Sequence, residues 1–437
     1  MSVKSGFVIG GASSGSGKTT LTLGLLRALY RRKVKVAPYK CGPDYIDPLI
    51  HQKAAHTPCY NLDAFFIPET EQLKRHFAQT ASQADVCVVE GVMGLFDGYE
   101  RSKGSSAEMA KKLGLPVILI IDAKAVAYSI AAPLYGFKHF DPDLRIAGVI
   151  FNRTGSEHHY ELLCDAARSI GIEPLGYIPK DSGLEISSRH LGLTIDPDFD
   201  WERLLNHAAD MVEKHVDIDR ILSCCILDET SLSHKIEQQT APQEKQTVVA
   251  IARDEAFNFT YQANIDKISS MAQIVYFSPI HDSHLPDCDF LYLPGGYPEF
   301  FAEQLSRNES MKTSIAKYAE NGGKIWAECG GMMYLTEALI TEDEVSHPMA
   351  GILPAKATMV NKKMRLGYRS LNINGIEYRG HEFHYSHLTH NPGKSMAVIY
   401  DSKGNPTETG LWRIKNVYAG YTHIYWGENT SPFMLFD

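Results

Sequence analysis

The stretch Gly10–Thr20, with the sequence GGASSGSGKTT, decides the fold of the first half of the chain. An apolar run precedes it at 7–9, and an amphipathic run follows it over 21–30. This order predicts a strand, a glycine-rich loop and a helix, and Ala12–Thr19 fits the P-loop pattern with Ala in place of the first Gly. Small residues let successive backbone N–H groups turn toward phosphate oxygens, and the helix directs its positive end at the same anions. The flanking strand and helix favour a nucleotide-binding loop over an ordinary Gly/Ser turn.

The residues expected to bind ATP lie in this loop and at the end of a later strand. Lys18 can reach the β- and γ-phosphates, and the Thr19 hydroxyl can ligate Mg²⁺. The predicted strand over 146–151 ends at Asn152, which we interpret as a contact to the nucleotide base. The predicted ATP site consists of Ser14, Gly15, Ser16, Gly17, Lys18, Thr19, Thr20 and Asn152.

Two acidic stretches follow predicted strands downstream of the P-loop. The strand at 34–39 runs into KCGPDYIDP at 40–48, and the strand at 85–89 ends at Glu90. In an open parallel sheet, ligands bind at the carboxyl ends of the strands. An acidic residue in this place has the layout of a Walker B carboxylate, which holds Mg²⁺ directly or through water. A solvated loop at 40–48 and a surface position for Glu90 are the alternatives.

The remaining pattern predicts two α/β domains. Predicted strands alternate with helical stretches at 105–113, 123–136 and 157–170, which indicates a doubly wound parallel sheet. The composition then turns polar, and we predict a synthetase domain over 1–222, a linker over 223–246 and a second α/β domain over 247–437.

Composition excludes several classes of function. The net charge is −9 and no long basic tract occurs, which argues against nucleic acid as the main partner. The eight cysteines form no CxxC pair, so neither a zinc ribbon nor a disulfide framework is expected, and reduced thiols fit a cytoplasmic protein. No apolar run approaches the ~18 residues of a membrane span, and the chain enters a strand too early for a signal peptide.

The second domain carries the pattern of a cysteine nucleophile. The predicted strand at 324–327 runs into Glu328-Cys329-Gly330-Gly331 and a predicted helix over 332–339. Such an elbow exposes the side chain, and we expect the helix N-terminus to lower the thiol pKa, although a free Cys is more often structural. The turn at 294–299 can offer the N–H groups of Gly295 and Gly296 as an oxyanion hole.

A thiol nucleophile needs a base, and three histidines are candidates. His381 and His384 lie in the GHEFH run, and His423 closes a strand-like run near the C-terminus. Spacing alone does not choose among them.

Seven motifs, taken in order, resemble a known family. The motifs are GGASSGSGKTT, KCGPDYIDP, VEGVMGLFDG, LPGGYPE, AECGG, MRLGYR and GHEFHYS. The first half resembles the dethiobiotin-synthetase-like P-loop amidoligases, and the second resembles class I glutamine amidotransferase domains. Together, over nearly the whole chain, they resemble the cobyrinic acid a,c-diamide synthase family.

The resemblance implies roles for individual residues. Cys329 would be the glutaminase nucleophile and His423 its base. The substrate or second site would contain Asp44, Tyr45, Asp47 and Asp97, and the metal would be held by Thr19, Asp44 and Glu90. The chain departs from the HxE pattern at His423-Ile424-Tyr425, so the third triad member is either Glu382 or absent.

The reaction implied by the resemblance is amidation of the a and c carboxylates of a corrin through acyl phosphates. ATP with Mg²⁺ would activate each carboxylate, and ammonia from L-glutamine would reach it by a sheltered route. For a tetrapyrrole polycarboxylate we expect a basic cluster at Lys362, Lys363, Arg365 and Arg369. The sequence does not decide whether the protein forms a homodimer.

Other functions remain as alternatives. The same reaction on hydrogenobyrinic acid or a nickel sirohydrochlorin is the nearest, followed by the longer cobyric acid synthase. A MinD-like ATPase switch lacks a use for Cys329, and Ser13 stands where such switches carry their signature lysine. A dinucleotide-binding oxidoreductase would need GxGxxG, which the P-loop does not provide.

Overall fold

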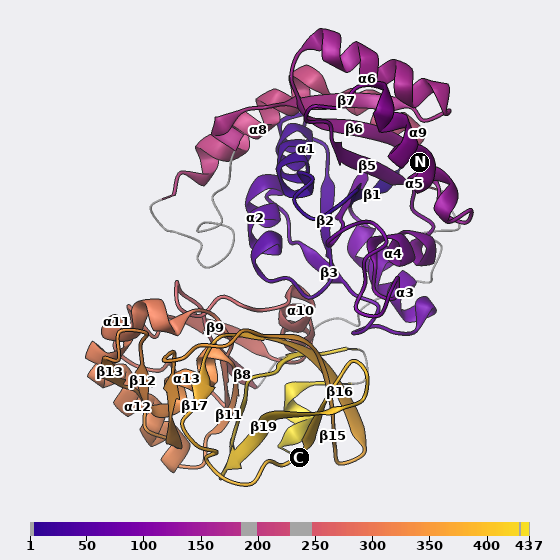
Figure 1. Cartoon of the computed structure of the whole chain (residues 1–437). Coiled ribbons are helices and arrows are strands. Elements are labelled where there is room, and N and C mark those ends of the chain that lie inside the picture. The colour runs from indigo at the N-terminus through magenta and orange to yellow at the C-terminus, as the bar shows by residue number, and fades with distance from the viewer. Residues whose placement is uncertain (1–3, 185–198, 228–246, 428–429, 437) are drawn as a thin grey trace. The chain divides into compact units, whose positions relative to one another are not determined.

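The computed structural model of the chain describes residues 4–184, 199–227, 247–427 and 430–436. These residues fall into two compact units, the first ending at 227 and the second beginning at 247 (Figure 1). Of the predicted linker, 228–246 lie outside the described residues. Residues 223–227 belong to the first unit, because Ile226 forms a bridge with Ser5 and the Leu227 side chain packs against Gly6.

The first unit is built on a seven-stranded parallel sheet with the order β3-β2-β4-β1-β5-β6-β7. The strands are β1 Ser5–Gly11, β2 Val36–Cys41, β3 Tyr60–Leu62, β4 Val86–Glu90, β5 Val117–Asp122, β6 Ile146–Thr154 and β7 Pro174–Pro179. The strand order reverses around β1 and β4, which are neighbours in the sheet. The P-loop follows β1, and β4 ends at Glu90. Ligands of doubly wound sheets bind at such a switch point.

Helices cover both faces of this sheet, which confirms the predicted doubly wound fold (Figure 1). The helices are α1 Lys18–Arg31, α2 Ile46–Ala55, α3 Thr70–Ala81, α4 Ser106–Leu113, α5 Ala131–Phe140, α6 Glu157–Ser169, α8 Trp201–His215 and α9 Ile218–Cys224. The helix predicted over 123–136 starts later. Asp122 accepts a hydrogen bond from the Lys124 amide at 2.9 Å, and Ala125 has a φ of 57°, so the chain turns before it becomes helical.

The second unit contains a ten-stranded mixed sheet with the order β21-β16-β15-β18-β19-β20-β11-β10-β8-β9. Its parallel part consists of β9 Gln273–Phe277, β8 Val248–Ala252, β10 Phe290–Leu293, β11 Lys324–Glu328 and β20 Val417–Gly420. The antiparallel part consists of β19 Pro406–Ile414, β18 Val398–Asp401, β15 Arg365–Ile373, β16 Ile376–His384 and β21 His423–Tyr425.

A smaller sheet and four α-helices complete this unit. The smaller sheet contains β12 Thr336–Ile340, β13 Ser346–Pro348, β14 Leu353–Thr358 and β17 His387–Leu388. The helices are α10 Gln262–Met271, α11 Ala302–Arg307, α12 Glu309–Glu320 and α13 Gly330–Leu335. The predicted helix over 332–339 is shorter because Thr336 begins β12, which pairs with β14. Among the described residues, no helix is long and apolar enough to span a membrane.

The core of the second unit is divided into two clusters, because successive side chains along its buried strands alternate between the two faces of the sheet. Leu293 and Ala327 belong to the cluster that also contains Cys329, whereas Tyr292 and Trp326 belong to a second cluster. Neighbouring strand residues point to opposite faces of a sheet. The end of β11 therefore sends Glu328 toward Tyr292 and Trp326, and Cys329 toward the other cluster.

Candidate active sites

The P-loop forms a tight turn at the carboxyl end of β1. Gly15 and Gly17 have φ of 72° and 104°, which residues with a Cβ rarely adopt. A Cβ on Gly17 would lie 2.1 Å from Asn152 Nδ2. Asn152 Nδ2 donates to the Ser16 carbonyl at 2.9 Å. The residue interpreted as a base contact therefore braces the loop.

Lys18, the first residue of α1, is buried with its ammonium directed back at the loop. Its Nζ donates to the Ser13 carbonyl at 3.4 Å and to the Met93 carbonyl. Burial lowers the pKa of Lys18, and the charge of Glu90 opposes this effect. The ammonium therefore lies at the turn, where it donates hydrogen bonds to neutral carbonyl oxygens that a phosphate could replace.

Glu90 joins three elements at the floor of the site. Its Oε1 accepts from Thr19 Oγ1 at 2.8 Å and from Lys40 Nζ at 2.7 Å, and its Oε2 lies 2.7 Å from His51 Nε2. The carboxylate is completely buried. Burial alone would raise its pKa, but Lys40 and His51 hold the pKa below its ordinary value. Glu90 is therefore an ionised carboxylate, not a surface residue.

Lys40 and His51 were missed by the sequence-based assignment of the site. Lys40 is the next-to-last residue of β2 and contacts both Asp47 and Glu90. Burial lowers the pKa of Lys40, but those two carboxylates outweigh it and raise the pKa well above its ordinary value. Lys40 begins the KCGPDYIDP stretch, so its place at a strand end was a usable signal. Nothing in the sequence singles out His51, whose Nδ1 lies 3.6 Å from Cys59 Sγ.

The other acidic candidates occupy different environments. Asp44 Oδ1 accepts from the backbone N–H groups of Ile46 and Asp47 at 2.8 and 3.0 Å and fixes the start of α2. Burial and then Asp44 raise the pKa of Asp47 to about 6. Tyr45 is buried. Asp97 is exposed and accepts from the Gly94 amide at 3.1 Å, which closes its own turn.

A cleft of about 1050 Å³ opens above these groups. Of the predicted residues, it is lined by Ser14, Gly15, Gly17, Lys18, Thr19, Thr20, Asp44, Glu90 and Asn152. Ser16, Tyr45, Asp47 and Asp97 lie outside this lining. The cleft also contains Arg153, which follows Asn152 at the end of the same predicted strand, and charged residues that the sequence-based assignment did not include, namely Lys40, Asp122, Lys124, Lys180 and Asp181.

The donors in this cleft fit Mg²⁺ bound together with a nucleotide. Within the described ranges, no group of three or more His, Cys, Asp or Glu side chains forms a metal site. Mg²⁺ typically takes one or two carboxylates, with phosphates and water as the other ligands. Thr19 and Glu90 are already in contact, and Asp44 lines the same cleft. These three residues would offer hard oxygen ligands of the kind that the ion takes.

Cys329 occupies a strained elbow between β11 and α13. Its φ of 45° and ψ of −104° are unusual for a residue with a Cβ, and the residue is 3% exposed. Its amide donates to the Gly420 carbonyl at 2.7 Å. Burial, and next Glu299, raise the pKa of the thiol. The expectation of a lowered pKa is wrong, because the six-residue helix behind the thiol does not offset its burial.

The elbow touches the predicted oxyanion turn through glycines. A Cβ on Gly330 would lie 3.0 Å from the Gly296 nitrogen, and one on Gly331 would lie 2.1 Å from the Leu293 oxygen. His423 lies against the same turn, since a Cβ on Gly295 would be 2.0 Å from its Cε1. The structure therefore brings the elbow, the Gly295-Gly296 turn and His423 together.

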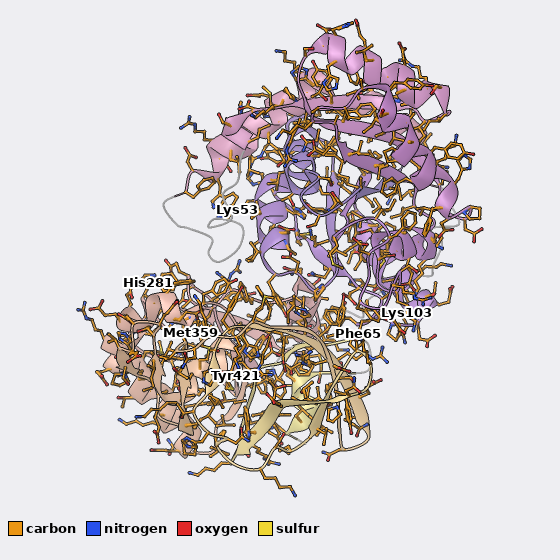
Figure 2. All side chains as sticks on the ribbon, in the orientation of Figure 1. Lys53, Phe65, Lys103, His281, Met359 and Tyr421 are labelled. Carbon is orange, nitrogen blue, oxygen red and sulfur yellow. The ribbon has the colours of Figure 1, made fainter. Side chains whose placement is uncertain are left out.

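The other two histidines are part of the surroundings of His423. His381 faces His423 in the register of β16 and β21, and burial lowers its pKa to about 3. His384 stacks on Tyr421 with ring centroids 3.8 Å apart, and its Nδ1 lies 2.9 Å from the Ser386 oxygen. Tyr421 is labelled in Figure 2 within the second unit.

Glu382, the candidate third triad member, is bound elsewhere. Its Oε2 accepts from Arg369 Nε at 2.8 Å, and its Oε1 accepts from the hydroxyls of Thr409 and Thr422, each at 2.8 Å. Arg369 is buried in this pair, so it does not belong to a surface cluster with Lys362, Lys363 and Arg365. A different carboxylate, Glu328, lies 4.0 Å from His423 Nδ1 through its Oε2.

A second cleft, of about 360 Å³, lies in the second unit. Its rim carries Lys363, Arg365 and Glu408, the last two paired at 2.6 Å. Tyr421 and His384 line it deeper in the unit. Tyr421 belongs to the same buried cluster as Cys329, and burial raises the pKa of its hydroxyl.

Comparisons with known proteins agree with this division. A family described as CobQ/CobB/MinD/ParA nucleotide binding domain matches residues 7–193, and one described as CobB/CobQ-like glutamine amidotransferase domain matches 248–431. The cobyrinate a,c-diamide synthase of Streptococcus sanguinis is 40% identical over 96% of this chain and 95% of its own length. That of Salmonella typhimurium is 40% identical over 98% and 96%, and that of Dehalococcoides mccartyi (strain ATCC BAA-2266) 41% over 97% and 95%. A solved glutamine amidotransferase covers 40% of this chain at 18% identity and a TM-score of 0.29, too low to add to the assignment.

Proposed function

The chain belongs to the cobyrinate a,c-diamide synthase family, and from that premise we propose that it amidates the a and c side-chain carboxylates of cobyrinate. It is a glutamine-dependent ligase that uses ATP. The observation that carries the residue assignment is the presence of two chemically different sites, one in each unit. The first has a P-loop over an ionised carboxylate, and the second has a cysteine elbow beside an oxyanion turn.

The first unit activates the carboxylate. A substrate carboxylate attacks the γ-phosphorus of ATP, the bond to the β-phosphate oxygen breaks, and the products are an acyl phosphate and ADP. Lys18 and the P-loop N–H groups bind the phosphates and offset the charge that develops on them. Mg²⁺, held by Thr19, Glu90 and Asp44, would supply further charge neutralisation. Ammonia then attacks the acyl carbon, phosphate leaves, and loss of a proton gives the amide.

Lys40 stabilises this site through its two carboxylate contacts. Its ammonium lies between Asp47 and Glu90. Without it, a polycarboxylate substrate would approach uncompensated negative charge. Lys40 keeps the floor of the cleft compatible with an anionic substrate.

The second unit releases ammonia from glutamine. His423 takes the proton of the Cys329 thiol, and the sulfur attacks the side-chain carbonyl carbon. The N–H groups of Gly295 and Gly296 stabilise the oxyanion, and His423 returns the proton to the departing ammonia. Water then attacks the thioester with His423 as base, and glutamate leaves as the thiol is restored.

The 360 Å³ cleft suits the zwitterionic end of glutamine. Lys363 and Arg365 match an α-carboxylate, and Glu408 matches an α-ammonium. Because Tyr421 in this cleft and Cys329 share one buried cluster, we expect one glutamine molecule to contact both the cleft and the Cys329 thiol. Loss of Lys363 should then raise KM for glutamine more than it lowers kcat.

The test is product analysis with a panel of tetrapyrrole acids. Purified protein is incubated with ATP, Mg²⁺ and glutamine, together with cobyrinate, hydrogenobyrinate or nickel sirohydrochlorin. We expect ADP, glutamate and a diamide in a ratio of two ADP per diamide with cobyrinate as the preferred acceptor. A preference for either other acceptor would reassign the substrate, and ADP formation without any amide would refute the ligase assignment.

A further inference from the structure

Glu328 stands directly before the nucleophile, at the last position of β11, and its carboxylate is fixed from three sides. Oε1 accepts from Trp326 Nε1 at 2.7 Å and from the Ile424 amide at 3.0 Å. Oε2 accepts from the Tyr292 hydroxyl at 2.8 Å. The residue is 1% exposed. A buried carboxylate with this support cannot change its position easily.

The same carboxylate faces the candidate base. Oε2 lies 4.0 Å from His423 Nδ1, and the amide that Oε1 binds belongs to the residue after His423. The Cys329 amide binds Gly420, three residues before His423. The first of these hydrogen bonds ties the Glu328 side chain to β21, which carries the base, and the second ties Cys329 to the end of β20, the preceding strand.

The rival carboxylate lies beside a different histidine. Both oxygens of Glu382 are occupied by Arg369, Thr409 and Thr422. The histidine nearest to it is His384, whose Nε2 lies 3.8 Å from Glu382 Oε2. Glu382 therefore stabilises a neighbouring buried network.

We infer that Glu328 is the positioning residue of the glutaminase, which accepts the Nδ1–H of His423 and leaves Nε2 for the Cys329 thiol. This inference rests on the proposed function of the second unit. The separation of 4.0 Å exceeds a hydrogen bond, and such contacts in free enzymes commonly tighten when the substrate arrives. Once His423 has taken the thiol proton, the imidazolium and the carboxylate attract each other, which favours closure.

No covalent bond to Glu328 forms or breaks. The proton moves from Cys329 Sγ to His423, then to the leaving ammonia, and a water proton replaces it during thioester hydrolysis. Glu328 fixes the tautomer and offsets the transient charge, as the carboxylate does in a Ser-His-Asp triad. It thereby supplies the third group that the sequence after His423 does not provide.

The titration of the surrounding groups gives a specific signature. Burial raises the pKa of Glu328 to about 7 despite its hydrogen bonds from Trp326, Ile424 and Tyr292. Burial, with smaller effects of His381 and His384, lowers the pKa of His423 to about 3, while Glu382 acts in the opposite direction. Glutaminase activity should therefore fall as pH drops through about 7, because Glu328 becomes protonated while free His423 remains neutral.

The experiment compares Glu328→Gln, Glu328→Asp and two control variants. Glutamate release is measured without tetrapyrrole over a range of pH, and alkylation of Cys329 is followed in parallel. Glu328→Gln should lower kcat by about 10⁴-fold with little change in KM, because the amide no longer fixes the tautomer of the base, and this loss is smaller than that for the nucleophile or base. It should also lose the acid limb near pH 7, which Glu328→Asp should retain.

Glu299→Gln and Glu382→Gln are the matched controls. Burial raises the pKa of Glu299 to about 7 as well, and the charge of Glu299 acts on the Cys329 thiol. Glu299→Gln therefore tests whether the fall in activity below about pH 7 comes from Glu299 instead of Glu328. Fluorescence of Trp326, Trp412 and Trp426 reports whether the unit is folded, and ligation with ammonium salt reports on the other site. A folded Glu328→Gln enzyme with wild-type kcat and pH profile, or transfer of the phenotype to either control, would overturn the inference. A wild type that releases no glutamate would instead refute the proposed function.

Discussion

Replacement of Lys40 by alanine should distinguish the activity of the first unit from that of the second most clearly. The Lys40 ammonium contacts Asp47 and Glu90, and the three side chains are 5%, 13% and 0% exposed. Removal of one partner from a buried ion pair costs about 3–5 kcal/mol, because the remaining charge is left in a medium that solvates it poorly. Here two carboxylates lose the same partner, and His51 still contacts one of them. We expect the first unit to lose about 3–5 kcal/mol of its free energy of unfolding at about pH 8.

The sign of the pH dependence follows from the same groups. The pKa of Asp47 is already raised to about 6, and loss of Lys40 raises it further. A group whose folded pKa is raised contributes its stability at low pH and loses it as pH rises through that value. The deficit of Lys40→Ala against wild type should therefore be largest above about pH 6 and should shrink toward about pH 5.

The assay is urea unfolding at both pH values, with hydrogen exchange of peptides over 36–62 and 86–90 to locate the change. Lys53→Ala is the control, because it removes the same charge from an exposed position on the adjacent α2 (Figure 2). Ligation should be lost with either nitrogen donor, while glutamate release continues. A deficit below about 1 kcal/mol at both pH values, the level of an exposed pair, would refute this account of Lys40.

Four further substitutions test the remaining assignments. Lys18→Ala should abolish ligation with glutamine or ammonia, and activity within about tenfold of wild type, against the several kcal/mol of a lost phosphate contact, would contradict the P-loop role. Glu90→Gln should remove ligation and alter its Mg²⁺ dependence but spare glutamate release; an unchanged Mg²⁺ titration would exclude it as a ligand. Cys329→Ser and His423→Ala should lose glutamine-dependent activity and keep ammonia-dependent ligation, more strongly at raised pH where more free ammonia is present. Retained glutamine activity in His423→Ala would make His381 or His384 the base.

Local motifs carried most of what the sequence predicted correctly. The P-loop, the strand before it and the elbow at Cys329 each depend on neighbouring residues, so a single stretch identifies them. The partners of Glu90 come from β2, α2 and the P-loop, and no spacing rule connects Lys40 or His51 to position 90. The raised pKa of Cys329 likewise depends on burial by distant strands, which a short motif does not encode.

The roles of the two glutamates in the second unit illustrate the same limit. Glu382 lies in the histidine-rich GHEFH run and was the candidate for the third triad member, but its oxygens are bound by an arginine and two threonines. The sequence pattern assigns no role to Glu328, which directly precedes Cys329. Its contacts with Tyr292 and Ile424 cross 36 and 96 residues of sequence and exist only in the folded sheet.

The depth at which Cys329 lies also bears on its reactivity toward other reagents. A thiol with a raised pKa stays protonated at neutral pH and is slow to react with peroxide or soluble electrophiles. Between turnovers, the nucleophile is therefore chemically silent and resists oxidative inactivation. At 3% exposure, the thiol also offers little surface to adventitious amides in solution.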